Sequence, residues 1–151
     1  MSGHQSHNFW NFLFSVFFLF VLAAAVYCVR ALTGGYPSEV PVFDAILMAF
    51  ATLRITRLIV YDKIARWFRE LFVRGDNGFI YTVRDLLECP WCIGFWSALA
   101  ISFSYFVFPW AWFVIFFLAL AGAGSLLQII ANGVGWRAET LKLEAKEKGT
   151  L

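Results

Sequence analysis

The chain has 151 residues, the length of one domain, and 61% of them are hydrophobic, against roughly 45–50% in soluble domains. Only 15% are charged, 20% are aromatic, and the formal net charge is +2. A soluble protein of this size has too little core to hide so much apolar surface. The composition therefore excludes a soluble enzyme, a disordered chain and a secreted disulfide scaffold, and the small net charge gives no support for nucleic-acid binding.

Four segments are predicted to cross a membrane as helices, which makes the expected fold all-α and integral to the membrane. Residues 9–29 form an almost unbroken apolar run that spans about 30 Å, the thickness of the hydrocarbon core. No Lys or Arg precedes this run, which weakens its interpretation as a cleaved signal peptide. The other three spans are expected at residues 42–61, 89–108 and 110–131, with a tight hairpin at Pro109 and Trp110.

The predicted organisation has three parts. Residues 1–41 form an N-terminal transmembrane helix and loop, and residues 42–132 form a three-helix membrane core that includes a polar segment at 62–88. Residues 133–151 form a charged tail, expected to break at its glycines and to end in a short helix.

Basic residues in the loops predict the orientation. With four spans, the N-terminus, residues 62–88 and the tail share one side of the membrane. That side holds nine loop Lys and Arg, whereas the opposite loops hold Arg30 alone. Basic loops favour the cytoplasmic side. The pattern therefore predicts a protein of the cytoplasmic (inner) membrane with both termini in the cytoplasm.

The segment at 62–73 has apolar residues at helical spacing and basic residues on the other face. This pattern is typical of an amphipathic helix that lies in the membrane interface. We expect residues 62–74 to contact anionic lipid headgroups, and residues 79–88 to form a second short helix leading into the third span.

Two arginines inside the second span are the costliest residues of the chain. A central Arg costs roughly 2.5–3.5 kcal/mol on insertion scales, so a partner is expected. One interpretation is that Arg54 and Arg57 extend to lipid phosphates; another is a hydrogen-bonded bundle without a ligand. The sharper hypothesis is a polar cluster at the cytoplasmic face that binds a lipid headgroup, a metal or a partner protein. Its predicted members are Arg54, Arg57, Asp62, Glu88, Trp91, Gln128 and Asn132, together with Cys89 and Cys92.

The sequence Cys89-Pro90-Trp91-Cys92 places two sulfurs one helical turn apart. Pro90 suits a first helical turn, which would put Cys89 near the N-cap, where a thiol pKa is lowered. The pair fits a packing role, half of a tetrahedral zinc site, or a redox dithiol. Zinc requires four ligands, so a site made of cysteines alone would need a dimer. No other cofactor is indicated.

Small residues at a spacing of about four recur on the last three predicted spans and suggest close helix packing. We expect the Phe-rich first span to pack outside this core. The small-residue faces are Ala45, Ala49, Thr52 and Thr56; Gly94, Ala98 and Ser102; and Ala119, Gly122 and Ala123.

The stretch from residue 51 to residue 96 resembles the bacterial domain-of-unknown-function 1360 family. The resemblance rests on an Arg-x-x-Arg-Leu helix end followed by an acidic residue, and on a Cys-x-x-Cys that begins another span. It covers about residues 43–132 and implies a small membrane protein of a kind found in bacteria, including a sporulation-associated member, and in phages. It implies no reaction. The matching positions are Arg54, Arg57, Leu58, Asp62, Cys89, Trp91, Cys92 and Trp96.

The leading interpretation is a non-enzymatic multi-pass membrane protein that acts as a structural or interaction protein, either as a homo-oligomer or with a membrane protein partner. The alternative is a membrane thiol–disulfide redox protein that uses Cys89 and Cys92. A third hypothesis, a small pore or holin-like protein, rests on the size of the chain and its charged tail.

Overall fold

The structure is a computed structural model that describes residues 3–35, 39–70 and 78–147, and within those ranges it is helical and has no strand. This confirms the all-α prediction. The elements are α1 (Gly3–Thr33), α2 (Val42–Val60), the 3-10 turn η1 (Lys63–Ala65), α3 (Arg66–Glu70), α4 (Gly78–Glu88), α5 (Pro90–Val107) and α6 (Ala111–Glu147).

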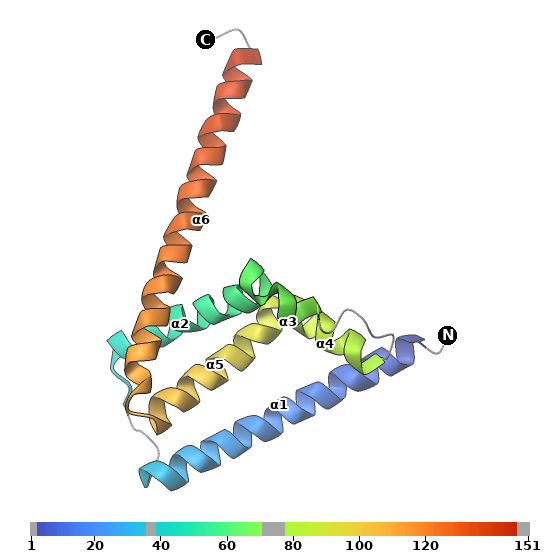
Figure 1. Cartoon of the computed structure of the whole chain (residues 1–151), viewed down its shortest axis with the longest axis vertical. Helices are drawn as coiled ribbons and strands as arrows, with labels where there is room; N and C mark the ends of the chain where they lie inside the picture. Colours follow the sequence, from blue (N-terminus) through green and yellow to red (C-terminus); the bar gives the residue numbers. More distant parts are fainter. Residues whose placement is uncertain (1–2, 36–38, 71–77, 148–151) are drawn as a thin grey trace.

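The helices form a bundle from which one end of α6 projects (Figure 1). Helix α2 packs against both α5 and α6, whereas α1 contacts α4 and α5. Figure 1 shows α1 and α5 running side by side and α6 rising steeply away from them. Most side chains of α1 are exposed, which confirms that the Phe-rich helix packs outside the core.

Three helices, and not the four predicted, are long and apolar enough to cross a membrane by length and composition. They are α1 over Phe9–Thr33, α5 over Pro90–Val107 and α6 over Ala111–Lys146. The fourth predicted span corresponds to α2, which has 19 residues. Asp44, Arg54 and Arg57 fall within it, and three charges in so short a helix set it apart from the others.

The buried core lies where α2 meets α5 and α6. Leu47 and Ala51 of α2 pack with Ile101 of α5 and with an alanine-rich face at the start of α6. The closest approach is at Gly122 of α6, where a Cβ would collide with the carbonyl oxygen of Phe50 and lie 3.0 Å from its carbonyl carbon. A glycine is required there because two helix backbones touch.

The small-residue face was predicted correctly on α6 and only in part on α2, where Thr56 is buried. Ala119 is 2% exposed and Gly122 is buried, as expected. Ala45 and Ala49, however, point outward, and the buried face of α2 passes through Leu47 and Ala51 instead. Small size permits a contact but does not select a helix face, and larger apolar side chains gain more from burial.

The prediction that the chain breaks at its tail glycines is wrong. Helix α6 continues unbroken through Gly133 and Gly135 to Glu147. A glycine in a helix costs only about 1 kcal/mol relative to alanine. The charged tail is therefore the outer half of α6 rather than a separate short helix.

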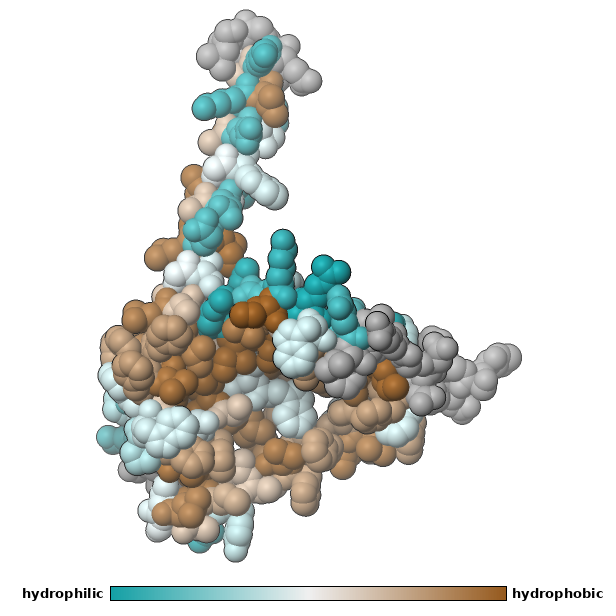
Figure 2. All heavy atoms as spheres, viewed as in Figure 1, coloured by the Kyte–Doolittle hydropathy of each residue, from teal (hydrophilic) through white to brown (hydrophobic). Residues whose placement is uncertain are grey.

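The predicted amphipathic helix at 62–73 is replaced by shorter elements. Asp62 is extended, η1 and α3 follow, and α3 ends at Glu70; residues 71–77 lie outside the described residues. The prediction of a short helix at 79–88 is confirmed by α4. Figure 2 shows hydrophilic residues gathered along one edge of the apolar body and along the projecting part of α6.

Candidate functional site

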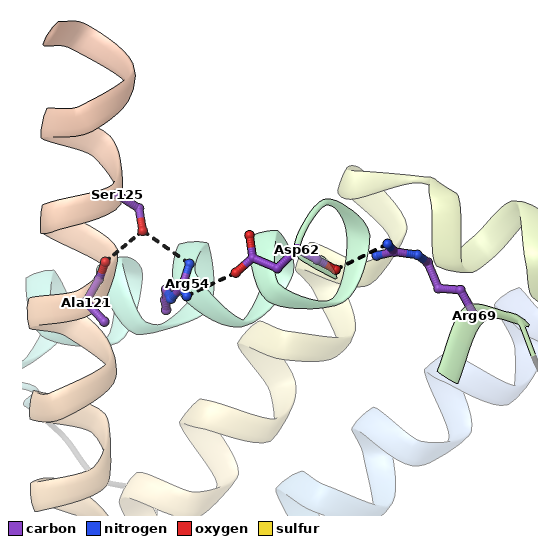
Figure 3. Close-up of polar contacts among 5 residues, drawn as sticks. All are labelled: Arg54, Asp62, Arg69, Ala121 and Ser125. Atoms are coloured by element: carbon purple, nitrogen blue, oxygen red, sulfur yellow. Dashed lines mark hydrogen bonds and ion pairs between the residues drawn. The ribbon is translucent and has the colours of Figure 1, made fainter. Parts of the chain in front are cut away.

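Arg54 is the centre of a polar network that links α2 to α6. Its Nη2 lies 3.0 Å from Oδ2 of Asp62, and its Nη1 donates to Oγ of Ser125 at 3.2 Å. The Ser125 hydroxyl in turn donates to the carbonyl of Ala121. Figure 3 shows these contacts between the two helices. The side chains of Arg54 and Asp62 are 25% and 30% exposed, so the ion pair is partly sheltered from solvent.

The end of α2 is shaped so that Asp62 faces back toward Arg54. The helix stops at Val60, and Asp62 takes an extended backbone conformation with φ −73° and ψ 143°. Arg69 then donates to the carbonyl oxygens of Ile59 and Asp62, the second at 3.2 Å (Figure 3). The last carbonyls of a helix lack partners within it, and Arg69 supplies donors for them.

Arg57 points away from this network. Its guanidinium carbon lies 5.5 Å from the centre of the Tyr61 ring, a cation–π distance. Its Nε is buried, and the part of the chain that the structure describes provides no hydrogen-bond partner for it.

The single predicted cluster does not form. Glu88 is exposed and Trp91 is 82% exposed, on outward faces of α4 and α5. Gln128 and Asn132 are also exposed and bond to each other at 3.2 Å. Equal depth in the membrane was taken as proximity, but α6 rises away from the other helices toward its end (Figure 1). Of the predicted partners, Asp62 alone reaches Arg54.

A second, partly buried polar contact was missed by the sequence reasoning. Tyr105 of α5 donates to Oδ2 of Asp44 at 2.5 Å. Asp44 was noticed only as a charge near the start of its span. A carboxylate in an apolar helix needs a donor, and the antiparallel course of α2 and α5 brings the end of α5 beside it.

The Cys89–Cys92 pair has the predicted helix-end geometry. Cys89 is the N-cap of α5, Pro90 follows in the first turn, and the sulfur of Cys89 accepts from the backbone N–H of Cys92 at 3.4 Å. Both cysteines are free thiols. A hydrogen bond from the Cys92 thiol, aided by the N–H groups of Cys92 and Trp91, lowers the pKa of the Cys89 thiol.

Metal ligands do not gather around the two thiols. Within the described residues, no group of three or more His, Cys, Asp and Glu is placed to hold a metal ion. Cys89 and Cys92 would supply two of the four ligands that a zinc site requires.

A hollow of about 270 Å³ between α3 and α4 is lined by three arginines together with Glu70, Leu87 and Glu88. Arg66 donates from Nε to Glu70 at 2.7 Å, and Arg84 lies over the Tyr81 ring with its guanidinium carbon 4.6 Å from the ring centre. The third arginine is Arg69 of α3, which is hydrogen-bonded to the end of α2. Sequence patterning placed Arg66 and Arg69 on one helix face of 62–73, and the structure adds Arg84 from α4 to the same hollow.

Comparison with known proteins identifies the family. A family model described as "Protein of unknown function (DUF1360)" matches residues 47–79 and 75–131, which is more than half of the chain. The chain belongs to the DUF1360 family. This confirms the resemblance based on the arginine pair and the Cys-x-x-Cys.

Two DUF1360 relatives come from Bacillus subtilis (strain 168). The UPF0713 protein YngL is 36% identical over 103 residues, which cover 60% of this chain and 78% of YngL. The sporulation protein YjcA is 29% identical over 106 residues, which cover 58% of this chain and 89% of YjcA. No solved structure matches the chain.

The DUF1360 region contains most of the sites described above, with Asp44 just outside it. The Arg54 network, the two thiols and the arginine hollow all fall within residues 47–131, whereas α1 and the outer half of α6 lie outside the matched range. The family model therefore covers the helical core, and α1 and the outer half of α6 flank the matched range.

Proposed function

We propose that this DUF1360 protein is a non-enzymatic, four-span protein of the cytoplasmic membrane that binds anionic lipid headgroups in the arginine hollow between α3 and α4. The observation that carries the proposal is the convergence of Arg66, Arg69 and Arg84 on one hollow at the end of the apolar helices. The network around Arg54 supports this site because it holds the end of α2 in place, and η1 and α3 follow α2 along the chain.

The four-span part of the proposal rests on the position of α2. It packs along α5, and the two helices have nearly the same length, 19 and 18 residues. If α5 crosses the bilayer, α2 must cross beside it. Two of its three charges are already paired, Asp44 with Tyr105 and Arg54 with Asp62, which reduces the cost of insertion. The charge distribution of the loops favours both termini in the cytoplasm.

The chemistry of the hollow fits a phosphate group. Guanidinium groups bind phosphate oxygens through paired N–H donors. The Arg66 side chain is 73% exposed and uses its Nε on Glu70, which leaves its terminal nitrogens available. Figure 2 shows the hydrophilic edge directly beside apolar surface, where a bound headgroup could keep its acyl chains in the bilayer.

The test is retention of anionic lipid by the purified full chain. The protein is released from bilayers of mixed phosphatidylcholine and phosphatidylglycerol, and the co-purifying lipids are counted by native mass spectrometry. We expect phosphatidylglycerol to be enriched around the unaltered protein and the enrichment to be lost in Arg66→Gln/Arg84→Gln.

The matched control is Lys142→Gln/Lys146→Gln, which removes the same positive charge from the exposed outer half of α6. An equal loss of phosphatidylglycerol in both double variants would attribute the effect to net charge and contradict a site in the hollow.

A second function, thiol–disulfide exchange, is favoured by one specific observation. The Cys92 backbone N–H contacts the Cys89 sulfur at 3.4 Å at the start of α5, so the two thiols sit together at a helix N-terminus, where the thiolate is stabilised. Trapping of a Cys89–Cys92 disulfide in cells grown without reductant would support this function. Two free thiols under every growth condition would contradict it.

A further inference from the structure

The thiols of Cys89 and Cys92 lie in the wall of a cavity formed by three helices. It has a volume of about 630 Å³ and lies between α1, α4 and α5, within the range of roughly 300–1,000 Å³ typical of small-molecule sites. Cys89, Cys92 and Asp85 lie in its wall, and aromatic side chains that include Phe14 and Trp96 line it as well.

A second, apolar cavity lies further along the same two helices. Its volume is about 280 Å³, and its walls include Leu22 and Val26 of α1 and Leu99 of α5. Leu22 and Leu99 are each about one helical turn beyond residues of the first cavity. The two cavities are therefore neighbours along the α1–α5 seam, which Figure 1 shows as two parallel helices.

Aromatic contacts hold the seam together near the junction of the cavities. The ring centres of Phe18 and Trp96 are 5.0 Å apart, and those of Phe17 and Trp96 are 5.9 Å apart. The first cavity thus has flat aromatic walls beside a polar, thiol-bearing end, and the second continues as an apolar groove. A ligand that fills both must carry a planar polar ring at one end and an apolar chain at the other.

We propose that the α1–α5 seam binds a prenylated quinone, with its ring beside Cys89 and Cys92 and its prenyl chain in the second cavity. Among membrane amphiphiles, quinones combine a flat ring with a long apolar chain and also react with a dithiol. The proposal deepens the second candidate function, thiol–disulfide exchange, and rests on it.

The quinone is the only oxidant that the proposed reaction requires. The S–H bonds of Cys89 and Cys92 break and one S–S bond forms between the two sulfurs. The two electrons and two protons pass to the quinone ring, which becomes the hydroquinone. Cys89, the helix N-cap, is the thiol placed to react as the thiolate.

The experiment uses the reduced full chain with Cys28→Ala, in bilayers without oxygen. A prenylated naphthoquinone is added, and free thiols and hydroquinone absorbance are followed together. We expect the loss of two thiols for each hydroquinone formed. Menadione, which has the ring without the chain, should react at least about tenfold more slowly, because burial of the chain supplies binding energy.

A variant that fills the second cavity tests whether the prenyl chain binds there, independently of the reactivity of the thiols. Ser102→Phe places a ring in the second cavity, which Ser102 lines. It should slow oxidation by the prenylated quinone about tenfold and leave the menadione rate unchanged. The matched control is Ala131→Phe on the exposed part of α6, which should change neither rate.

The outcomes distinguish the two levels of the proposal. If both quinones oxidise the thiols at the same rate in every variant, the quinone site is overturned and thiol exchange stands. If neither quinone removes the thiols, the quinone site is overturned, and the trapping of a Cys89–Cys92 disulfide in cells decides the thiol function separately. A slower menadione reaction, together with a Ser102→Phe effect confined to the prenylated quinone, supports the site.

Discussion

Arg54 and Asp62 are eight residues apart in the sequence, yet their side chains form an ion pair of 3.0 Å across the end of α2. The pair exists because the chain becomes extended at Asp62 and its side chain returns along the helix. Through Ser125 the same guanidinium also holds α6. One side chain therefore fixes both the end of α2 and its crossing with α6.

Replacing Arg54 should weaken the whole crossing. Arg54→Leu removes the ion pair and the Ser125 hydrogen bond and leaves the Asp62 carboxylate without its cation, which should reduce the free energy of unfolding by about 1.5–3 kcal/mol. The measurement is the unfolding midpoint in mild detergent. Arg137→Leu, on the exposed outer half of α6, is the control, and equal midpoints for the two variants would contradict the role of Arg54.

The closest point of the α2–α6 crossing offers a second test. Gly122→Ala forces a methyl group into the Phe50 carbonyl, and overpacking of this kind typically costs 1–3 kcal/mol. Gly124→Ala, two residues away on the same helix, meets nothing within 4 Å and should be neutral or slightly stabilising. The comparison is made by thermal unfolding in one detergent. A neutral Gly122→Ala would show that the helices do not touch there.

The sequence was sufficient to predict the helical class and the need for a partner of Arg54. Loop charge and turn residues also located Asp62 as an anion near the end of α2. The failure at Gln128 and Asn132 has a geometric cause, since a crossing angle is set by packing over a whole interface. Helix periodicity contains no such information, so residues at equal depth were assigned to a common site.

Hydropathy likewise located α1, α5 and α6, because their apolar runs are long. It could not settle the status of α2, whose charges are satisfied by residues distant in the sequence, such as Tyr105. The end of α6 was placed too early because Gly133 and Gly135 were given the weight of helix stops. No proline follows them in the sequence, and glycine without proline is a weak stop.

The contact between Asp44 and Tyr105 predicts energetic coupling between α2 and α5. Tyr105→Phe removes the donor to the carboxylate at 2.5 Å and should destabilise the fold by about 1–3 kcal/mol. Asp44→Ala removes the acceptor, and the double variant should be less unstable than the sum of the two, with a coupling of about 0.5–3 kcal/mol. Tyr27→Phe, on the exposed side of α1, is the control for loss of a hydroxyl. Additive effects would contradict the contact.

The last prediction concerns the pH dependence of Cys89. A hydrogen bond from the Cys92 thiol is the largest cause that lowers the pKa of Cys89 below 9.0. In a Cys28→Ala background, Cys92→Ala removes that donor and should raise the pKa. The thiolate fraction at neutral pH then falls, so alkylation by iodoacetamide becomes several-fold slower and its midpoint moves to higher pH. Cys89→Ala is the control that identifies the reacting thiol, since it should abolish the rapid reaction. A midpoint that stays in place or moves to lower pH after Cys92→Ala would show that the helix N-terminus, and not the neighbouring thiol, stabilises the thiolate.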